Sequence, residues 1–224
     1  MNDKKPLIIA VINQKGGVGK TSTSVNLAYT LAKKKKETLL IDLDSQANSS
    51  RIYLKPGEDQ ETIVRIFEGG GCDMIDLVSP AYLRGQKVDN LFLIPSDIQL
   101  AKRIEKTAST IHKKILVNHI KRLPDYPEYI IIDCPPSFGV LNNNAMFAAD
   151  LVLIPTTYSI DSLNGITDLL ESVKAVKEIK TGNGVNFRIL RNAKDKRTKQ
   201  TNKFIGSELQ VYADNLLRTA IVKS

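Results

Sequence analysis

Short apolar runs alternate with helix-like segments along this chain, and this alternation constrains the fold more than any other feature. The runs are rich in Ile, Leu and Val and stand at Leu7–Asn13, Thr38–Asp44, Leu91–Pro95, Tyr129–Pro135, Leu151–Pro155 and Asn186–Leu190. Such runs are typical of strands buried on both faces of a parallel sheet. The segments between them carry apolar residues at helical spacing. The pattern predicts an α/β fold with a doubly wound, mostly parallel sheet and helices on both faces.

Composition narrows the class of protein further. The 224 residues are 42% hydrophobic and 25% charged, which is ordinary for a globular protein, and no linker divides them, so we expect one domain over 1–224. No apolar run is long enough to span a bilayer, and the N-terminus lacks the features of a signal peptide. Cys72 and Cys134 are far apart, which favours two reduced thiols in a cytoplasmic protein. The formal net charge of +8 favours a polyanionic partner.

A glycine-rich segment follows the first apolar run and reads QKGGVGKTS over Gln14–Ser22. The strict phosphate-loop pattern GxxxxGK[ST] fails, because Gln14 stands where its first glycine would be. The backbone N–H groups of such a loop still cradle phosphates at a helix N-terminus, and the alternative is a chance glycine turn. The predicted phosphate-binding residues are Lys15, Gly16, Gly17, Val18, Gly19, Lys20, Thr21 and Ser22. Within this set Lys20 would contact the β- and γ-phosphates and Thr21 would bind Mg²⁺.

A second lysine at the start of the loop needs its own explanation. Lys15 is placed where its side chain points away from its own helix, so a single chain has no evident need of it. It is well placed to reach phosphates bound by a second copy of the chain. The alternative is an ordinary solvated lysine.

Acidic residues close two of the apolar runs. Asp42 and Asp44 end the run in LLIDLDSQ, and Asp133 ends the run in YIIIDCPPS. Ligands bind at this edge of open α/β sheets. A carboxylate at the position of Asp133 suits Mg²⁺, usually through a water, or else caps its strand. Asp44 has the alternative of a helix cap or turn residue, and Asp42 that of a structural acid at a strand end.

The motif KGGVGKT resembles the deviant Walker-A ATPases of the ParA and MinD superfamily. The stretches LFLIPSDIQLAKRIE and FAADLVLIPTTYSIDSLNGITDLL are similar to segments of ParA-type, Soj-like DNA partition ATPases, and the match runs from about Leu7 to the end. This resemblance implies a P-loop ATPase of the short class that uses ATP and Mg²⁺ and hydrolyses ATP weakly until a partner stimulates it. It also implies that Lys15 crosses the interface of a nucleotide-sandwich homodimer, that Asp44 orients the attacking water and that Asp133 is the Walker-B acid. Ser45 stands where the family usually has proline.

The basic residues of the C-terminal part give the resemblance a second consequence. A cluster runs from Arg188 to Lys203 with one acid, Asp195, and its segment DKRTKQT is similar to the DxRT turn of the family. The resemblance implies non-specific binding of double-stranded DNA by the ATP-bound dimer, association with the nucleoid, a centromere-binding partner of the ParB type and no membrane. The DNA-contacting candidates are Lys196, Arg197, Lys199 and Lys203. A solvated basic face is the alternative, and it is favoured for a second cluster within Lys102–Arg122. His112 and His119 have no carboxylate or cysteine partner in sequence and are interpreted as ordinary helix residues.

Rival functions remain open at this point. A MinD-like membrane-cycling ATPase that positions a cell-division or other cargo shares every catalytic residue. An iron–sulfur carrier needs a paired cysteine site, which Cys72 and Cys134 do not offer, and a binding module without hydrolysis would lack Lys20 or Asp44. Resembling chains continue past the strand expected at Leu216–Ser224 with a loop for the adenine base and a closing helix, so we expect either a naturally short or a truncated chain.

Overall fold

The computed structural model describes most of the chain, and the account that follows is limited to those parts. They are residues 5–55, 57, 60–68, 71–107, 114–123, 127–137, 139–159, 166–175, 186–194 and 199–223. Among these residues no helix is long and apolar enough to cross a membrane. Cys72 and Cys134 are both free, as predicted.

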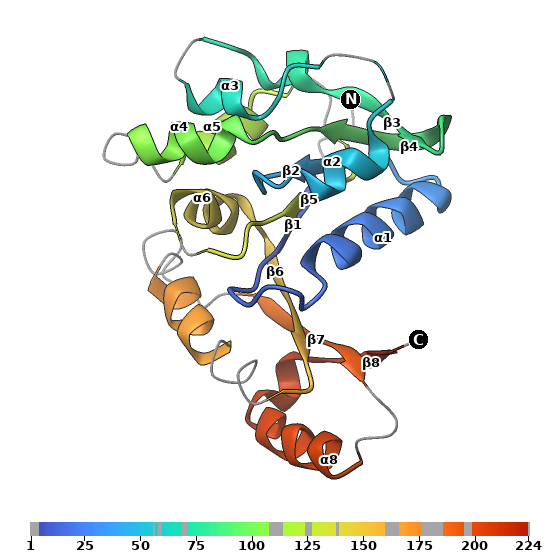
Figure 1. Cartoon of the computed structure of the whole chain (residues 1–224), viewed down its shortest axis with the longest axis vertical. Coiled ribbons are helices and arrows are strands. Elements are labelled where there is room, and N and C mark those ends of the chain that lie inside the picture. Colours follow the sequence, from blue (N-terminus) through green and yellow to red (C-terminus); the bar gives the residue numbers. More distant parts are fainter. Residues whose placement is uncertain are drawn as a thin grey trace.

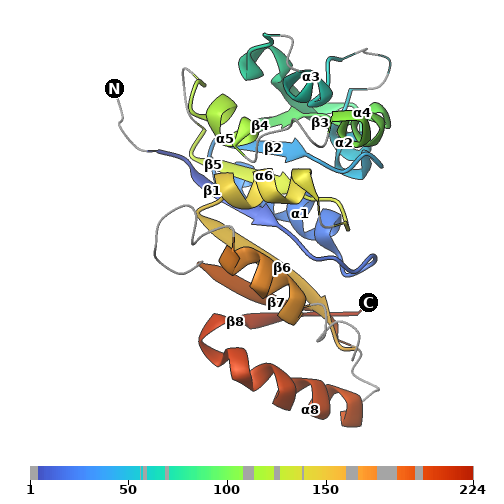
Figure 2. The ribbon, with the colours of Figure 1, turned by 90° about the vertical axis from the view of Figure 1, so that its left-hand side faces the viewer.

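One twisted sheet forms the centre of the molecule (Figures 1 and 2). Its strands lie in the order β3-β4-β2-β5-β1-β6-β7-β8. All neighbours pair in parallel except β3 and β4. The strands are β1 (Leu7–Val11), β2 (Thr38–Asp42), β3 (Ser79–Leu83), β4 (Gln86–Ile94), β5 (Tyr129–Asp133), β6 (Leu151–Thr157), β7 (Phe187–Lys194) and β8 (Leu216–Val222). The predicted fold class is confirmed.

Helices cover both faces of this sheet. One face packs against α1 (Lys20–Lys33) and α2 (Asn48–Tyr53), whose side chains join a core with Leu40, Leu93 and Ile131. The larger core on the other face lies beneath the remaining helices, with Figure 2 showing α6 in front of the sheet. Those helices are α3 (Val64–Phe67), η1 (Met74–Leu77), α4 (Gln99–Thr107), α5 (Ile115–Ile120), α6 (Val140–Ala148), a helix over residues 166–175, α8 (Lys199–Glu208) and η2 (Leu209–Asn215).

The antiparallel edge hairpin of β3 and β4 was not predicted from the sequence. The β3 segment SPAYL carries Pro80, which lacks a backbone donor and argues against a central strand. An edge strand tolerates it, because one row of its backbone groups has no partner strand. The helix α8 was also missed, since its segment KQTNKFIGSE is polar and contains Gly206, and it is held by the buried Ile205 with Leu209 just beyond its end.

Strand register brings the predicted acids together. In the β2–β5 pair Asp42 lies opposite Asp133, and in the β1–β5 pair Val11 lies opposite Asp133. The carboxyl ends of β1, β2 and β5 therefore meet at one edge, where the glycine-rich segment leaves β1 and enters α1. The candidate site is built at this edge.

Candidate phosphate-binding site

The glycine-rich segment turns from β1 into α1 through two left-handed glycines. Gly17 has φ of 75° and Gly19, the N-cap of α1, has φ of 91°. At Gly19 a side chain would also collide with Asn192, whose amide Nδ2 donates to the carbonyl of Val18 at 2.8 Å. Glycine is therefore required at Gly19 for both backbone angle and space. The α1 N-terminus has no side-chain cap, so its N–H groups face the loop and suit an anion.

Lys20 is held at the base of this loop. Its side chain is only 7% exposed, and its Nζ donates to the carbonyl of Lys15 at 3.3 Å. Burial lowers the pKa of Lys20, while the nearby charges of Asp133 and Asp44 oppose that shift. A buried ammonium with two carboxylates close by is placed to neutralise a phosphate at this edge.

Asp133 collects hydroxyl donors. The Ser24 hydroxyl donates to its Oδ1 at 3.0 Å, the Ser49 hydroxyl donates to its Oδ2, and the side chain of Thr21 forms a third hydrogen bond with it. Burial raises the pKa of Asp133, and these hydroxyls counter the rise. The structure thus brings together Thr21 and Asp133, the two residues predicted to bind a metal. Oxygen atoms of hydroxyl and carboxylate groups are the ligands that Mg²⁺ prefers, so the residues present fit that ion.

Asp44 and Asp42 play different parts. Asp44 is 9% exposed and lies near Lys20, and its Oδ1 accepts from the backbone N–H of Gln46 at 3.0 Å. Asp42 is fully buried, with its Oδ1 bonded to the N–H of Asp44 and its Oδ2 to the N–H and hydroxyl of Ser50. Burial, with the Asp133 charge beside it, raises the pKa of Asp42 to about 7. Asp42 therefore orders the loop that carries Asp44, which agrees with its interpretation as a structural acid.

Lys15 contacts another part of its own chain. Its Nζ donates to the hydroxyl of Ser159, which follows β6, at 3.0 Å, and its backbone N–H donates to Asn13 Oδ1. The buried Asn13 in turn donates to the carbonyl of Pro155 at 2.8 Å. In this single chain Lys15 thus contacts the segment that follows β6, and its contact with a second copy stays a prediction.

Several residues of the site were missed by sequence reasoning. Asn13, Ser49, Ser50 and Asn192 each hydrogen-bond the loop or one of its acids. A polar side chain at the end of a buried strand was a signal available for Asn13 and Asn192. No signal distinguished Ser49 and Ser50 from ordinary loop serines, because their partners are distant in sequence.

The predicted DNA-binding residues are only partly placed. Lys196 and Arg197 lie outside the described residues, as does the side chain of Lys199, while Lys203 is exposed on α8. Within the same cluster Arg191 donates to the carbonyls of Leu217 and Arg218 on β8, and Arg188 donates to the carbonyl of Phe187. Arg191 therefore joins β7 to β8 as well as adding charge, whereas Arg188 bonds only within its own segment.

The second basic cluster is also partly accounted for by contacts within the chain. Arg103 forms an ion pair with Glu68 at 2.8 Å and is itself exposed, as are Lys102, Lys114 and Arg122. His112, Lys113 and the side chain of Lys106 lie outside the described part of the chain. The ion pair supports a solvated, paired face here.

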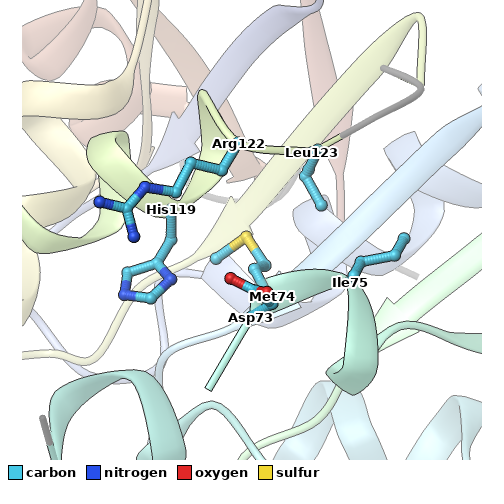
Figure 3. Close-up of a pocket in the computed structure, with 6 residues that line it drawn as sticks. All are labelled: Asp73, Met74, Ile75, His119, Arg122 and Leu123. Atoms are coloured by element: carbon cyan, nitrogen blue, oxygen red, sulfur yellow. The ribbon is translucent and has the colours of Figure 1, made fainter. Parts of the chain in front are cut away.

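A hollow of about 370 Å³ lies between η1 and the end of α5 (Figure 3). Its lining residues are Asp73, Met74, Ile75, His119, Arg122 and Leu123. Burial is the largest cause of a lowered pKa at His119, and its Nδ1 has no hydrogen-bond partner among the described residues. None of the lining residues belongs to the phosphate loop or its acids, so this hollow is separate from the candidate site.

Comparison with known proteins identifies the family. A protein-family model described as an AAA domain matches residues 7–185. The sporulation initiation inhibitor protein Soj of Bacillus subtilis is 35% identical over 218 residues, which cover 97% of this chain and 84% of Soj. The chain belongs to the ParA-type partition ATPases. The resemblance stated from the motifs is confirmed.

Solved structures of similar fold agree with this family. The apo form of McdA from Cyanothece has a TM-score of 0.83 at 25% identity, over 98% of this chain and 87% of McdA. A plasmid partition protein of Borrelia burgdorferi, bound to AMPPNP, has a TM-score of 0.78 at 27% identity, over 99% of this chain and 88% of that protein. These likenesses confirm the doubly wound architecture of the ParA-type ATPase.

Proposed function

We propose that this ParA-type ATPase binds ATP with Mg²⁺, dimerises on the bound nucleotide, and binds DNA non-specifically while the dimer lasts. The observation that carries the proposal is the convergence of Lys20, Thr21, Asp44 and Asp133 at the N-terminus of α1. The AMPPNP bound to the Borrelia relative supports the choice of nucleotide.

The triphosphate would lie on the N–H groups of the Gly16–Lys20 loop, with Lys20 neutralising the β- and γ-phosphates. Thr21 and Asp133 would hold Mg²⁺, which supplies further neutralisation of phosphate charge. Asp44 stands beside Lys20 on an ordered loop and would orient the attacking water. Turnover is slow until a partner completes the arrangement.

A second copy gives Lys15 its purpose. The Lys15 ammonium donates to the Ser159 hydroxyl of its own chain. In a dimer, this ammonium would instead contact phosphate oxygens of the nucleotide bound by the facing chain. A charged hydrogen bond to phosphate is stronger than one to a neutral hydroxyl. ATP would thus hold the dimer, and hydrolysis would release it.

DNA binding would use basic residues of the C-terminal part. These are Lys203, which is exposed on α8, and the residues Lys196, Arg197 and Lys199, which are close to it in sequence. Each contact is to a phosphate, so binding is indifferent to base sequence. A dimer doubles the contacts on one surface and multiplies affinity through effective concentration. The protein would then stay bound to nucleoid DNA until its ATP is hydrolysed. A ParB-type protein would stimulate this hydrolysis and so the release of the protein from DNA.

The test compares DNA gel shifts and light scattering with ATP, ADP and no nucleotide. We expect the parent protein to dimerise and to shift DNA with ATP but not with ADP or without nucleotide. Lys15→Ala should lose both dimerisation and the DNA shift while still binding nucleotide as a monomer. Lys174→Ala, on an exposed position of the helix over residues 166–175, is the matched lysine control. Equal DNA binding with ATP, with ADP and without nucleotide would refute the proposal that ATP controls DNA binding. Co-sedimentation with anionic liposomes and no DNA shift would favour the MinD-like alternative.

A further inference from the structure

Two neighbouring serines on α2 bind two different buried acids. Ser49 and Ser50 are both fully buried, and α2 begins only four residues after Asp44. Ser50 donates through its N–H and hydroxyl to Asp42 on β2, whereas the Ser49 hydroxyl donates to Asp133 on β5. One short helix therefore contacts both strands at the site edge.

Backbone hydrogen bonds hold the segment that carries Asp44 between these contacts. Asp44 N–H donates to Asp42, and Ala47 N–H donates to the Asp44 carbonyl at 2.8 Å. Ala47 has φ of 52°, a left-handed conformation that an alanine adopts only when its surroundings enforce it. These contacts thus connect Asp44 closely to α2, the helix that carries Ser49.

The other hydroxyl donors to Asp133 come from α1. Thr21 and Ser24 both belong to that helix, and the single Ser24 hydroxyl proton is shared between Asp133 Oδ1 and the Lys20 carbonyl, each at 3.0 Å. Ser49, in contrast, belongs to α2 and donates to Asp133 Oδ2. The Asp133 carbonyl accepts from the backbone N–H of Leu43, but among the described residues only the Ser49 hydroxyl joins the Asp133 carboxylate to the segment that follows Asp44.

We propose that Ser49 is a positioning residue that fixes the Asp133 carboxylate relative to Asp44. The inference rests on the proposed function, since it assumes that Asp133 faces Mg²⁺ and Asp44 faces water. With Ser49 in place, Oδ2 is held by the hydroxyl and the carboxylate cannot rotate freely, so the metal-side and water-side groups keep one spacing. Loss of the hydroxyl leaves the Asp133 carboxylate with hydrogen-bond donors on α1 alone, so the carboxylate can rotate away from Asp44.

The experiment measures fluorescent ATP-analogue binding as Mg²⁺ is titrated, beside steady-state ATPase kinetics, for the parent, Ser49→Ala, Ser49→Cys and Ser207→Ala. Ser207 is an exposed serine on α8 and serves as the matched control. Without Mg²⁺, we expect Ser49→Ala to bind the ATP analogue as tightly as the parent does. It should need several-fold more Mg²⁺ to reach half of the Mg²⁺-dependent gain in analogue affinity. Its kcat should fall about tenfold, with KM little changed. Ser49→Cys keeps the volume with a weak donor and should fall between.

The outcomes separate this inference from the proposed function. A parent that binds no ATP refutes the proposed function, whatever the variants do. A parent that binds and hydrolyses ATP, with Ser49→Ala matching it in Mg²⁺ dependence and kcat, refutes the role of Ser49. A fall in melting temperature with an unchanged Mg²⁺ requirement assigns Ser49 a purely structural role and also refutes it. If Ser49→Ala fails to fold, the same comparison is decided by Ser49→Cys.

Discussion

The edge that carries the phosphate loop and the C-terminal part of the sheet are built in opposite ways. At the loop edge Lys20 and Asp133 are 7% and 1% exposed, and the β1–β5 and β2–β5 pairs keep one register throughout. In the C-terminal part Phe204 and Val211 are 50% and 84% exposed, and the β7–β8 pair shifts register twice. The first region is a buried network of hydrogen bonds, and the second is an exposed surface formed by α8, η2 and β8.

This difference matches the two ligands proposed for them. A triphosphate and its metal ion need donors at fixed places, which only a buried and satisfied network supplies. Duplex DNA bound through its phosphates needs charge on an accessible surface and little exact geometry. Removing a charged group of the first region should therefore have a large effect on nucleotide binding or turnover, whereas substitutions in the second region should have graded, salt-dependent effects on DNA binding.

The largest expected effect is that of Lys20→Ala. It removes the buried ammonium beside the loop and leaves Asp133 and Asp44 without the opposing charge, so ATP affinity should fall by at least about 100-fold. Titration of a fluorescent ATP analogue measures this. Lys174→Ala should bind the ATP analogue like the parent. If Lys20→Ala also binds the analogue with the affinity of the parent, Lys20 is not part of the nucleotide site.

Asp44→Ala should separate binding from turnover. The loop and Lys20 remain, so nucleotide binding is retained, but kcat should fall by about 100-fold or more because the water loses its orienting acid. Phosphate-release kinetics and analogue binding on the same preparation give both quantities. We also expect the variant to stay on DNA longer than the parent in ATP. Unchanged kcat would contradict the assignment of Asp44.

Charge reversal in the C-terminal part tests the graded behaviour. Lys203→Glu, or Arg197→Glu, should weaken DNA binding by roughly tenfold at low salt and flatten the log–log salt slope by about 0.9 for each phosphate that the protein no longer neutralises. Gel shifts with ATP across a salt series give the slope. Lys174→Glu carries the same charge change elsewhere, and an equal weakening with that variant would mean that net charge alone governs binding.

The smallest expected effect is a pH dependence of stability centred on Asp42. Its pKa of about 7 in the folded chain exceeds the ordinary 3.8, so the folded state holds the proton more tightly, and the free energy of unfolding should fall by about 1 kcal/mol from pH 6 to pH 8. Asp133 on β5 shifts in the same direction. The pKa values of Lys20 and His119 are lowered by burial, so these two groups act in the opposite direction, because each favours folding more as the pH rises. Thermal melts of the nucleotide-free parent and Asp42→Asn across this range isolate the carboxyl. An equal slope in both proteins would show that another group titrates.

The sequence by itself was enough to predict the layers of the fold and to name candidate residues that the structure brings together at one edge of the sheet. Buried parallel strands appear as uninterrupted apolar runs, and the glycine loop, Lys20, Thr21 and the two strand-end acids Asp44 and Asp133 are local patterns with a local physical reason. Sequence patterns did not predict the short polar helices α2 and α8 or the edge strand β3. These elements lack a periodic apolar pattern of their own, and tertiary contacts that bury a few of their residues hold them in place.

Only the tertiary structure decided which side chains meet. Strand order places Asp42 beside Asp133, although the two are far apart in sequence, and so produces the shared burial that raises both pKa values. It likewise sets Asn192 against Gly19, Ser49 on Asp133 and Lys15 on Ser159. Hydrogen bonds across a sheet edge depend on which strands are neighbours and in what register. Residue types along one chain do not encode that locally, because pairing is fixed by packing the whole sheet between its two helix layers.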